Sequence, residues 1–190
     1  MFLEPLRFRA NSQLLAGFEI ARRELDKLTR DEFCPWPQAG AYEGAWLLFP
    51  LWLHEPPTDL AIDFAANQRR CPELTAYLRS LDGILSACFS WLDPGSHIMA
   101  HIDAYYPNVI RAHLGLKVPA SSMLRVAEAQ QELQERQVVM IDGQVEHEVA
   151  NLSKSPRVTL LIDAEMSPDE AQYVMAHSPA RRAQFEQQQG

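Results

Sequence analysis

The feature that most constrains the fold is the stretch from Ile84 to about Asp163, where short apolar runs alternate with turn residues. The runs are rich in Val, Ile, Leu and Phe, as in ILSACFSWL and RVTLLID, and sequences such as DPGS and SKSP separate them. Short strands spaced in this regular way are typical of an all-β sandwich or barrel. We therefore expect a β-barrel or jelly roll of about eight strands.

Helical patterns flank this stretch on both sides. A helix is predicted over 11–30, with Asn11 or Ser12 as its N-cap, and others over 72–81 and after the Ser-Pro pair at 167–168. The apolar face of the first helix recurs at steps of three and four and consists of Leu14, Phe18, Ala21, Leu25 and Leu28. We expect a single domain over 1–190, with 1–82 as helical support, 83–165 as the β-barrel core and 166–190 as a C-terminal helix and tail.

Charge and cysteine usage restrict the partners and the compartment. The chain has 17 basic and 25 acidic residues, a net charge of −8, and such a chain is repelled by phosphate backbones and anionic lipid headgroups. We therefore expect no nucleic-acid or membrane partner, but a small-molecule or peptide substrate. Three cysteines without a Cys-x-x-Cys pair, and an N-terminus without a signal-peptide core, favour a cytoplasmic protein. The oligomeric state stays unknown.

His101-Ile102-Asp103 is the first candidate for chemistry. Side chains two apart on an extended strand point the same way, so His101 and Asp103 are expected to share one space. Two imidazoles and one carboxylate, with open positions left on the metal, form the Fe(II) site of non-haem oxygenases. His147 opens a later strand-like segment and is the candidate third ligand. Alone, a His-x-Asp tripeptide is more often a surface ion pair.

Arg157 lies on the next expected strand after His147. An arginine there can hold the distal carboxylate of a 2-oxoglutarate cosubstrate with two parallel hydrogen bonds. An alternative interpretation is a non-catalytic, cupin-like metal-binding module, because zinc accepts two histidines and a carboxylate equally well. Such a module has no need for a cosubstrate clamp, so the arginines separate the two interpretations.

Longer motifs surround these residues. The segment WLDPGSH at 91–97, then His101, RAHLGL at 111–116 and EHEV at 146–149 together resemble the aspartyl/asparaginyl β-hydroxylase family. The resemblance extends from about Tyr42 to about Asp163. It implies a core that is a double-stranded β-helix, or cupin-like jelly roll. It also implies a dioxygenase that uses Fe(II), 2-oxoglutarate and O2 to hydroxylate an unactivated C–H bond of an amino acid or aspartyl/asparaginyl-type residue, releasing succinate and CO2.

The resemblance also implies roles for individual residues. His101 and His147 match the family's iron-binding histidines, and Arg157 matches the arginine that holds the far carboxylate of 2-oxoglutarate. The other matched contacts of that cosubstrate are Ser90, Arg111 and His113. For Arg111 the alternative is a surface strand residue, and for His113 a core histidine satisfied by a backbone carbonyl.

The chain departs from the family pattern at two places. The best-known animal members hold iron with two histidines and have no carboxylate where Asp103 stands. Strand geometry aims Asp103 at the metal, and a buried unpaired carboxylate is costly, so we predict three ligands. The second departure is Asp142-Gly143, a less acidic turn than in peptide-hydroxylating relatives, which predicts a different substrate pocket. Tyr105 and Tyr106 are predicted either to shape the substrate side or to pack at the rim.

Overall fold

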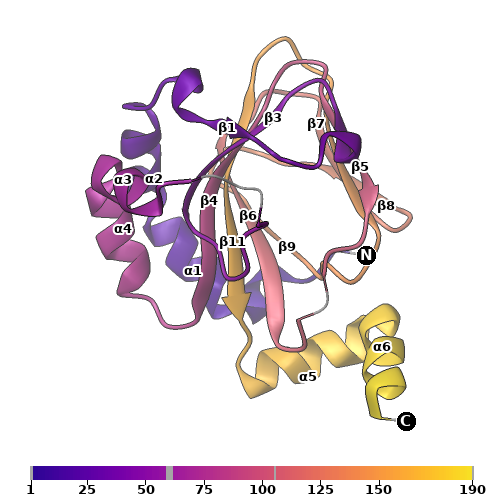
Figure 1. Ribbon diagram of the computed structural model, residues 1–190. Helices are drawn as coiled ribbons and strands as arrows, with labels where there is room; N and C mark the ends of the chain where they lie inside the picture. The colour runs from indigo at the N-terminus through magenta and orange to yellow at the C-terminus, as the bar shows by residue number, and fades with distance from the viewer. Residues whose placement is uncertain (1, 59–61, 105, 190) are drawn as a thin grey trace.

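Two antiparallel β-sheets lie face to face in the computed structural model, which describes residues 2–58, 62–104 and 106–189 (Figure 1). One sheet has six strands in the order β1-β3-β4-β11-β6-β9, and the other has five in the order β2-β5-β10-β7-β8. The strands are β1 (Cys34–Pro35), β2 (Tyr42–Glu43), β3 (Trp46–Trp52), β4 (Ile84–Leu92), β5 (His97–His101), β6 (Val109–Lys117), β7 (Ser122–Val126), β8 (Ala129–Glu132), β9 (Val138–Ile141), β10 (His147–Asn151) and β11 (Arg157–Glu165).

The eight strands β4 to β11 form a double-stranded β-helix. The first of them pairs with the last, β4 with β11, and the second with the second-last, β5 with β10. The inner pairs β6 with β9 and β7 with β8 follow the same rule. Successive pairs alternate between the two sheets, which is the jelly-roll arrangement. The predicted fold, mainly β with flanking helices around a cupin-like core, is confirmed.

Helices cover the outer face of the six-stranded sheet, on the left in Figure 1. They are α1 (Arg9–Ala16), α2 (Phe18–Leu25), α3 (Phe64–Arg70) and α4 (Pro72–Arg79), and α5 (Pro168–His177) and α6 (Pro179–Gln189) follow the barrel. The predicted apolar face of the first helix is buried throughout. Burial of that face against the sheet removes apolar surface from water and anchors the helices.

The single helix predicted over 11–30 is wrong in its bounds, because two shorter helices meet at Gly17. A β carbon on Gly17 would lie 2.3 Å from the Tyr77 ring, so only glycine lets α4 pack this closely. The helix also begins earlier than predicted: Phe8 is its N-cap, and Asn11 is a buried residue of its first turns. Tertiary packing here overrides the local capping preference.

The N-terminal region 1–82 contributes strands as well as helices, which the expectation of helical support did not include. The strand β3 joins the six-stranded sheet beside β4, and its five central residues are buried. Helices cover one side of this strand and the barrel interior covers the other. A strand buried on both faces reads as a continuous apolar run instead of an alternating pattern, which is why AWLLFPLWL carried no strand signal.

Two apolar cores result. The larger one lies between the helices and the six-stranded sheet, and it includes Phe89 of β4 and Leu160 of β11. The smaller one lies between the sheets and includes Leu124 of β7 and Val149 of β10. The second core fills only part of the barrel, and polar side chains occupy the remainder of the inner face. Within the described parts of the chain, the helices lack the length and apolarity that a membrane span requires.

Candidate metal centre

A β-bulge in β5 decides which histidine faces the interior of the barrel. His101 pairs with His147 across to β10, and Ile98 pairs with Val149. Two residues on β5 therefore stand opposite one residue on β10, so one extra residue is inserted in β5. The extra residue shifts the alternation, and Ile98 and His101 both line the same internal cavity. His97 lies on the outer side, where Glu148 faces it at 3.0 Å.

His101, Asp103 and His147 come together as the sequence predicted. Their ligand atoms all lie within 4.8 Å of one another. Each histidine Nε2 is 3.7 Å from one oxygen of the Asp103 carboxylate. Metal bonds of about 2 Å on each side bridge such separations with small side-chain shifts. Asp103 lies two residues beyond the end of β5, so the loop positions it, although the prediction placed it on the strand.

Both imidazoles present the same nitrogen to this cluster. The His101 Nδ1 lies 2.7 Å from the Met99 carbonyl oxygen, and the His147 Nδ1 lies 2.9 Å from that of Val145. A backbone carbonyl accepts a hydrogen bond only from a protonated nitrogen, so Nε2 is left with its lone pair toward the cluster. Burial lowers the pKa of His147, and the Asp103 charge only partly opposes this. A neutral imidazole is the form that binds a metal.

Arg111 holds the Asp103 carboxylate in place. Its Nη1 donates to Asp103 Oδ2 at 2.6 Å, and its Nε and Nη2 donate to Asp163 at 2.8 and 3.2 Å. Burial lowers the pKa of Arg111, but the charges of Asp163 and Asp103 outweigh it and keep the pKa above its usual value. The guanidinium thus orients a candidate ligand. The contact with 2-oxoglutarate that the resemblance implies for Arg111 stays a prediction.

Two further side chains that the resemblance assigns to the cosubstrate, Arg157 and His113, are buried inside the protein. Arg157 is 1% exposed, and its Nε and Nη2 have no hydrogen-bond partner among the described residues. Burial lowers its pKa to about 10, which still leaves it cationic at neutral pH. His113 is also buried, with neither ring nitrogen paired within the described chain. A buried charge without a partner is expensive, so Arg157, which lacks one among the described residues, has the chemistry of an anion-binding residue.

The backbone register explains why these residues meet. On β11, Arg157, Thr159, Leu161 and Asp163 alternate with the residues that pack under the helices. Leu161 and Asp163 line the internal cavity. Because side chains two apart on a strand share a face, Arg157 and Thr159 also lie on the inner face of the sheet. Thr159 is fully buried, and in the described structure its hydroxyl has no partner. Sequence reasoning missed Thr159, although its position two residues after Arg157 on a strand was a usable signal.

Ser90 lies on the inner face of β4 and is directly opposite Thr159 in the sheet. Its hydroxyl oxygen accepts a hydrogen bond from the Trp46 indole N–H at 3.0 Å. The hydroxyl proton of Ser90 remains available for an acceptor. His113 stands opposite Leu161 of β11, so Ser90 and His113 lie on the same inner face as Arg157. Their role toward 2-oxoglutarate stays a prediction.

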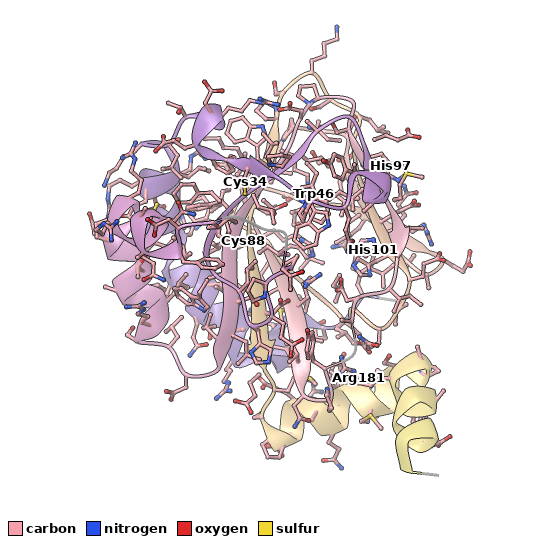
Figure 2. All side chains as sticks on the ribbon, in the orientation of Figure 1. Cys34, Trp46, Cys88, His97, His101 and Arg181 are labelled. Atoms are coloured by element: carbon pink, nitrogen blue, oxygen red, sulfur yellow. The ribbon has the colours of Figure 1, made fainter. Side chains whose placement is uncertain are left out.

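A cavity of about 440 Å³ opens beside the metal cluster. Figure 2 shows Trp46, Cys88 and His101 around this space between the two sheets. Its walls are mostly apolar or aromatic, and Arg111 and Arg181 supply the guanidinium groups. Burial raises the pKa of Cys88 to about 12, so it is an uncharged wall residue. Tyr106 lines the cavity and donates to Glu55 at 2.8 Å, whereas Tyr105 lies outside the described residues.

Taken together, the barrel contains an open three-ligand cluster and a buried cation that has no counter-ion among the described residues. The cluster matches the donor set of a non-haem Fe(II) site, with positions left for a cosubstrate and a small gas molecule. The buried guanidinium matches a carboxylate. A metal ion and a dianionic cosubstrate therefore fit the residues that are present.

Comparison with known proteins gives a family match. A family model described as aspartyl/asparaginyl beta-hydroxylase matches residues 16–167. The ornithine lipid ester-linked acyl 2-hydroxylase of Rhizobium tropici is 35% identical over 100 residues, which are 51% of this chain and 35% of that protein. The chain therefore spans about a third of the length of that curated relative.

Solved structures give more distant matches. A Pseudomonas putida prolyl-4-hydroxylase has a TM-score of 0.47 at 17% identity, over 87% of this chain and 89% of that chain. A Thermotoga maritima protein described as a predicted oxalate decarboxylase has a TM-score of 0.45 at 10% identity, over 73% of this chain and 98% of that chain. The order and pairing of the strands β4 to β11 define the fold.

Proposed function

Because the chain belongs to the aspartyl/asparaginyl β-hydroxylase family, we propose that it is an Fe(II)- and 2-oxoglutarate-dependent hydroxylase. The observation that carries the proposal is the buried Arg157 guanidinium, whose Nε and Nη2 have no partner among the described residues, in the same barrel as the three-ligand cluster. The proposed reaction hydroxylates an unactivated C–H bond of an amino acid or of an aspartyl/asparaginyl-type residue. A metal module without catalysis gives no physical reason to bury a cation without a partner.

The iron, 2-oxoglutarate and O2 supply the oxidising chemistry when bound: the cosubstrate is oxidised to succinate and CO2 while one oxygen atom enters the substrate C–H bond. The protein's part is binding and orientation. His101 and His147 offer Nε2, and Asp103 offers a carboxylate oxygen. Arg111 keeps that carboxylate directed at the cluster through its bonds to Asp103 and Asp163.

For the cosubstrate, we propose that Arg157 forms two parallel hydrogen bonds to the far carboxylate. Thr159 and Ser90 add hydroxyl groups on the same inner face of the sheet. His113 is held uncharged, because burial and the nearby Arg157 keep its pKa well below its usual value. A neutral His113 donates one hydrogen bond without adding a second charge to the pocket.

The cavity walls narrow the proposed substrate class. The guanidinium groups of Arg111 and Arg181 are both engaged with carboxylates or backbone carbonyls. Among the lining residues that the structure describes, neither group is left over for a substrate carboxylate. We therefore propose that the hydroxylated group is uncharged, as an asparaginyl or aliphatic side chain is. The relative from Rhizobium tropici acts on an ester-linked acyl chain, which also lacks charge along its length.

A succinate-release screen with Fe(II) and 2-oxoglutarate tests the activity. The substrates are the free amino acids, peptide pairs that differ only in Asp against Asn, and an ester-linked acyl chain on an ornithine headgroup. We expect stimulation by one uncharged class and a lower rate for each Asp peptide than for its Asn twin. If anaerobic Fe(II) protein gained no absorption band on adding 2-oxoglutarate, and Arg157→Ala changed nothing, the hydroxylase proposal would fail.

A further inference from the structure

The C-terminal helix α6, which lies beside one end of the barrel (Figure 1), carries Arg181, whose side chain lines the cavity (Figure 2). Arg181 is only 2% exposed, and its guanidinium contacts both oxygens of Asp142, which is equally buried. Ser178, at the junction of α5 and α6, donates to Asp142 at 2.6 Å. A buried ion pair contributes little net stability once the cost of removing both charges from water is counted. Its fixed geometry is therefore the better reason to retain it.

One set of Arg181 contacts leads to the cavity wall. Its Nη1 donates to the carbonyl oxygens of Tyr106 and Pro107 at 3.1 and 2.7 Å, and its Nη2 donates to that of Val109 at 2.8 Å. These three carbonyls belong to the connection into β6. Tyr106 and Val109 line the cavity, as Arg181 does itself. One side chain thus fixes the backbone of one wall of the site.

The other set of contacts leads to the metal cluster through the Asp142 turn. The backbone N–H of Gln144 donates to Asp142 Oδ1 at 3.1 Å. The Gln144 side-chain Nε2 donates to the carbonyl oxygens of Asp103 and Ala104 at 3.3 and 3.0 Å. The Asp103 amide donates to the Gly143 carbonyl at 2.9 Å. The turn at 142–144 therefore supports the loop that carries the candidate ligand Asp103.

We propose that Arg181 is a positioning residue for the metal and substrate sites, acting from beyond the region that matches the family. Through Asp142 it holds the turn that supports Asp103, and through three carbonyls it holds the wall that includes Tyr106. The inference rests on the proposed function, because that function identifies the cluster as a metal site. The contacts of Arg181 and Asp142 do not depend on it. It also gives the departure at Asp142-Gly143 a role, since Asp142 anchors α6 instead of facing a substrate.

Co(II) binding to the full-length protein tests the proposal, because Co(II) reports its ligands through visible absorption. Arg181→Met removes every polar contact, and Arg182→Met makes the same change at the exposed neighbour on α6. We expect Arg181→Met to weaken Co(II) binding about 10-fold, in the range for partners that orient metal ligands, and to shift the absorption band. Arg182→Met keeps the wild-type affinity and spectrum. Arg181→Lys, which retains the charge toward Asp142, recovers part of the loss.

The outcomes separate the two proposals. If the wild-type protein bound no Co(II), the proposed function would fail together with the inference. If the wild type bound Co(II) and a folded Arg181→Met variant bound it with the same affinity and band, only the inference would fail. Should Arg181→Met not fold, Ser178→Ala replaces it, because it removes one support of Asp142 and leaves Arg181 intact. Weaker Co(II) binding in that variant supports the inference, and unchanged binding overturns it.

Discussion

The Asp103 carboxylate packs directly against Gly143. A β carbon built on Gly143 would lie 2.4 Å from Asp103 Oδ2, and the Asp103 amide donates to the Gly143 carbonyl. Glycine is required here because the candidate ligand occupies the space that any side chain would need. The turn after β9 and the loop after β5 are thereby built as one unit.

Gly143→Ala is expected to displace the Asp103 carboxylate and weaken metal binding about 10- to 100-fold, the range for lost support of a ligand. The measurement is a titration with Co(II) or Fe(II) under anaerobic conditions. Gly40→Ala is the matched control, because nothing lies within 4 Å of a β carbon at that position. Equal metal affinity in the two variants would show that Asp103 is not confined by this contact.

Asp103→Gly distinguishes a three-ligand from a two-ligand site. We expect metal affinity and turnover to fall by more than about 10-fold, because the variant loses a ligand as well as the partner that orients Arg111. His101→Ala and His147→Ala are expected to abolish metal-dependent turnover and serve as the reference for complete loss. Retention of most activity in Asp103→Gly would remove Asp103 from the ligand set.

Arg157→Met is expected to change stability and cosubstrate binding in opposite directions. Without 2-oxoglutarate, removing an unpaired buried charge raises the free energy of unfolding by about 1 kcal/mol or more, roughly 2–4 °C in Tm for a chain of this size. With 2-oxoglutarate, the variant loses two charge-assisted hydrogen bonds of about 1.5–3 kcal/mol each, so binding weakens by at least about 100-fold. Thermal melts with and without 2-oxoglutarate measure both effects.

Arg157→Lys is the control for charge alone. The ammonium group cannot form two parallel hydrogen bonds to one carboxylate, so we expect 2-oxoglutarate affinity between those of the wild type and Arg157→Met. A wild-type response of Arg157→Met to 2-oxoglutarate would place the far carboxylate elsewhere.

Because the pKa of His113 is lowered in the folded state, we expect the metal-free protein to lose stability in mild acid. Its folded-state pKa lies well below 6.5 because of burial and the Arg157 charge, so the unfolded chain binds this proton first as the pH falls. The free energy of unfolding is unaffected by His113 above about pH 6.5. Below that pH, His113 lowers it by up to about 1.4 kcal/mol per pH unit. Urea unfolding at several pH values measures the slope.

His113→Gln is expected to flatten this slope between about pH 6.5 and 5. His177→Gln, at an exposed position on α5, is the control and keeps the wild-type slope. Equal slopes in the wild type and His113→Gln would mean that His113 does not carry the acid sensitivity.

The sequence predicted the barrel and the metal cluster because both depend on local pattern. Short apolar runs identified β4, β6, β7, β9, β10 and β11, and the family motifs identified His101 and His147. The strand β3 was not predicted, because burial on both faces removes the alternation of apolar and polar residues that marks a strand. The break between α1 and α2 at Gly17 was not predicted either, because it depends on the packing of the Tyr77 ring, which is distant in sequence.

The residues that position the ligands were harder to predict from the sequence than the ligands themselves. The partner of Arg111 is Asp163, which stands opposite it in the register of β6 and β11. The partner of Asp142 is Arg181, on a terminal helix that carries no motif. Contacts of this kind depend on which strands become neighbours, and a single sequence without alignment does not contain that information.

The bulge in β5 makes the metal centre depend on the geometry of one strand as well as on the identity of its residues. Without the bulge, strict alternation from Ile98 would turn His101, three residues later, away from the core and from His147. Deleting Met99 or Ala100 would instead place the metal histidine two residues after Ile98, so both side chains would face the core on a regular strand and the ligand would be kept. When homologous chains are aligned, a one-residue gap inside this strand is therefore compatible with a retained ligand histidine.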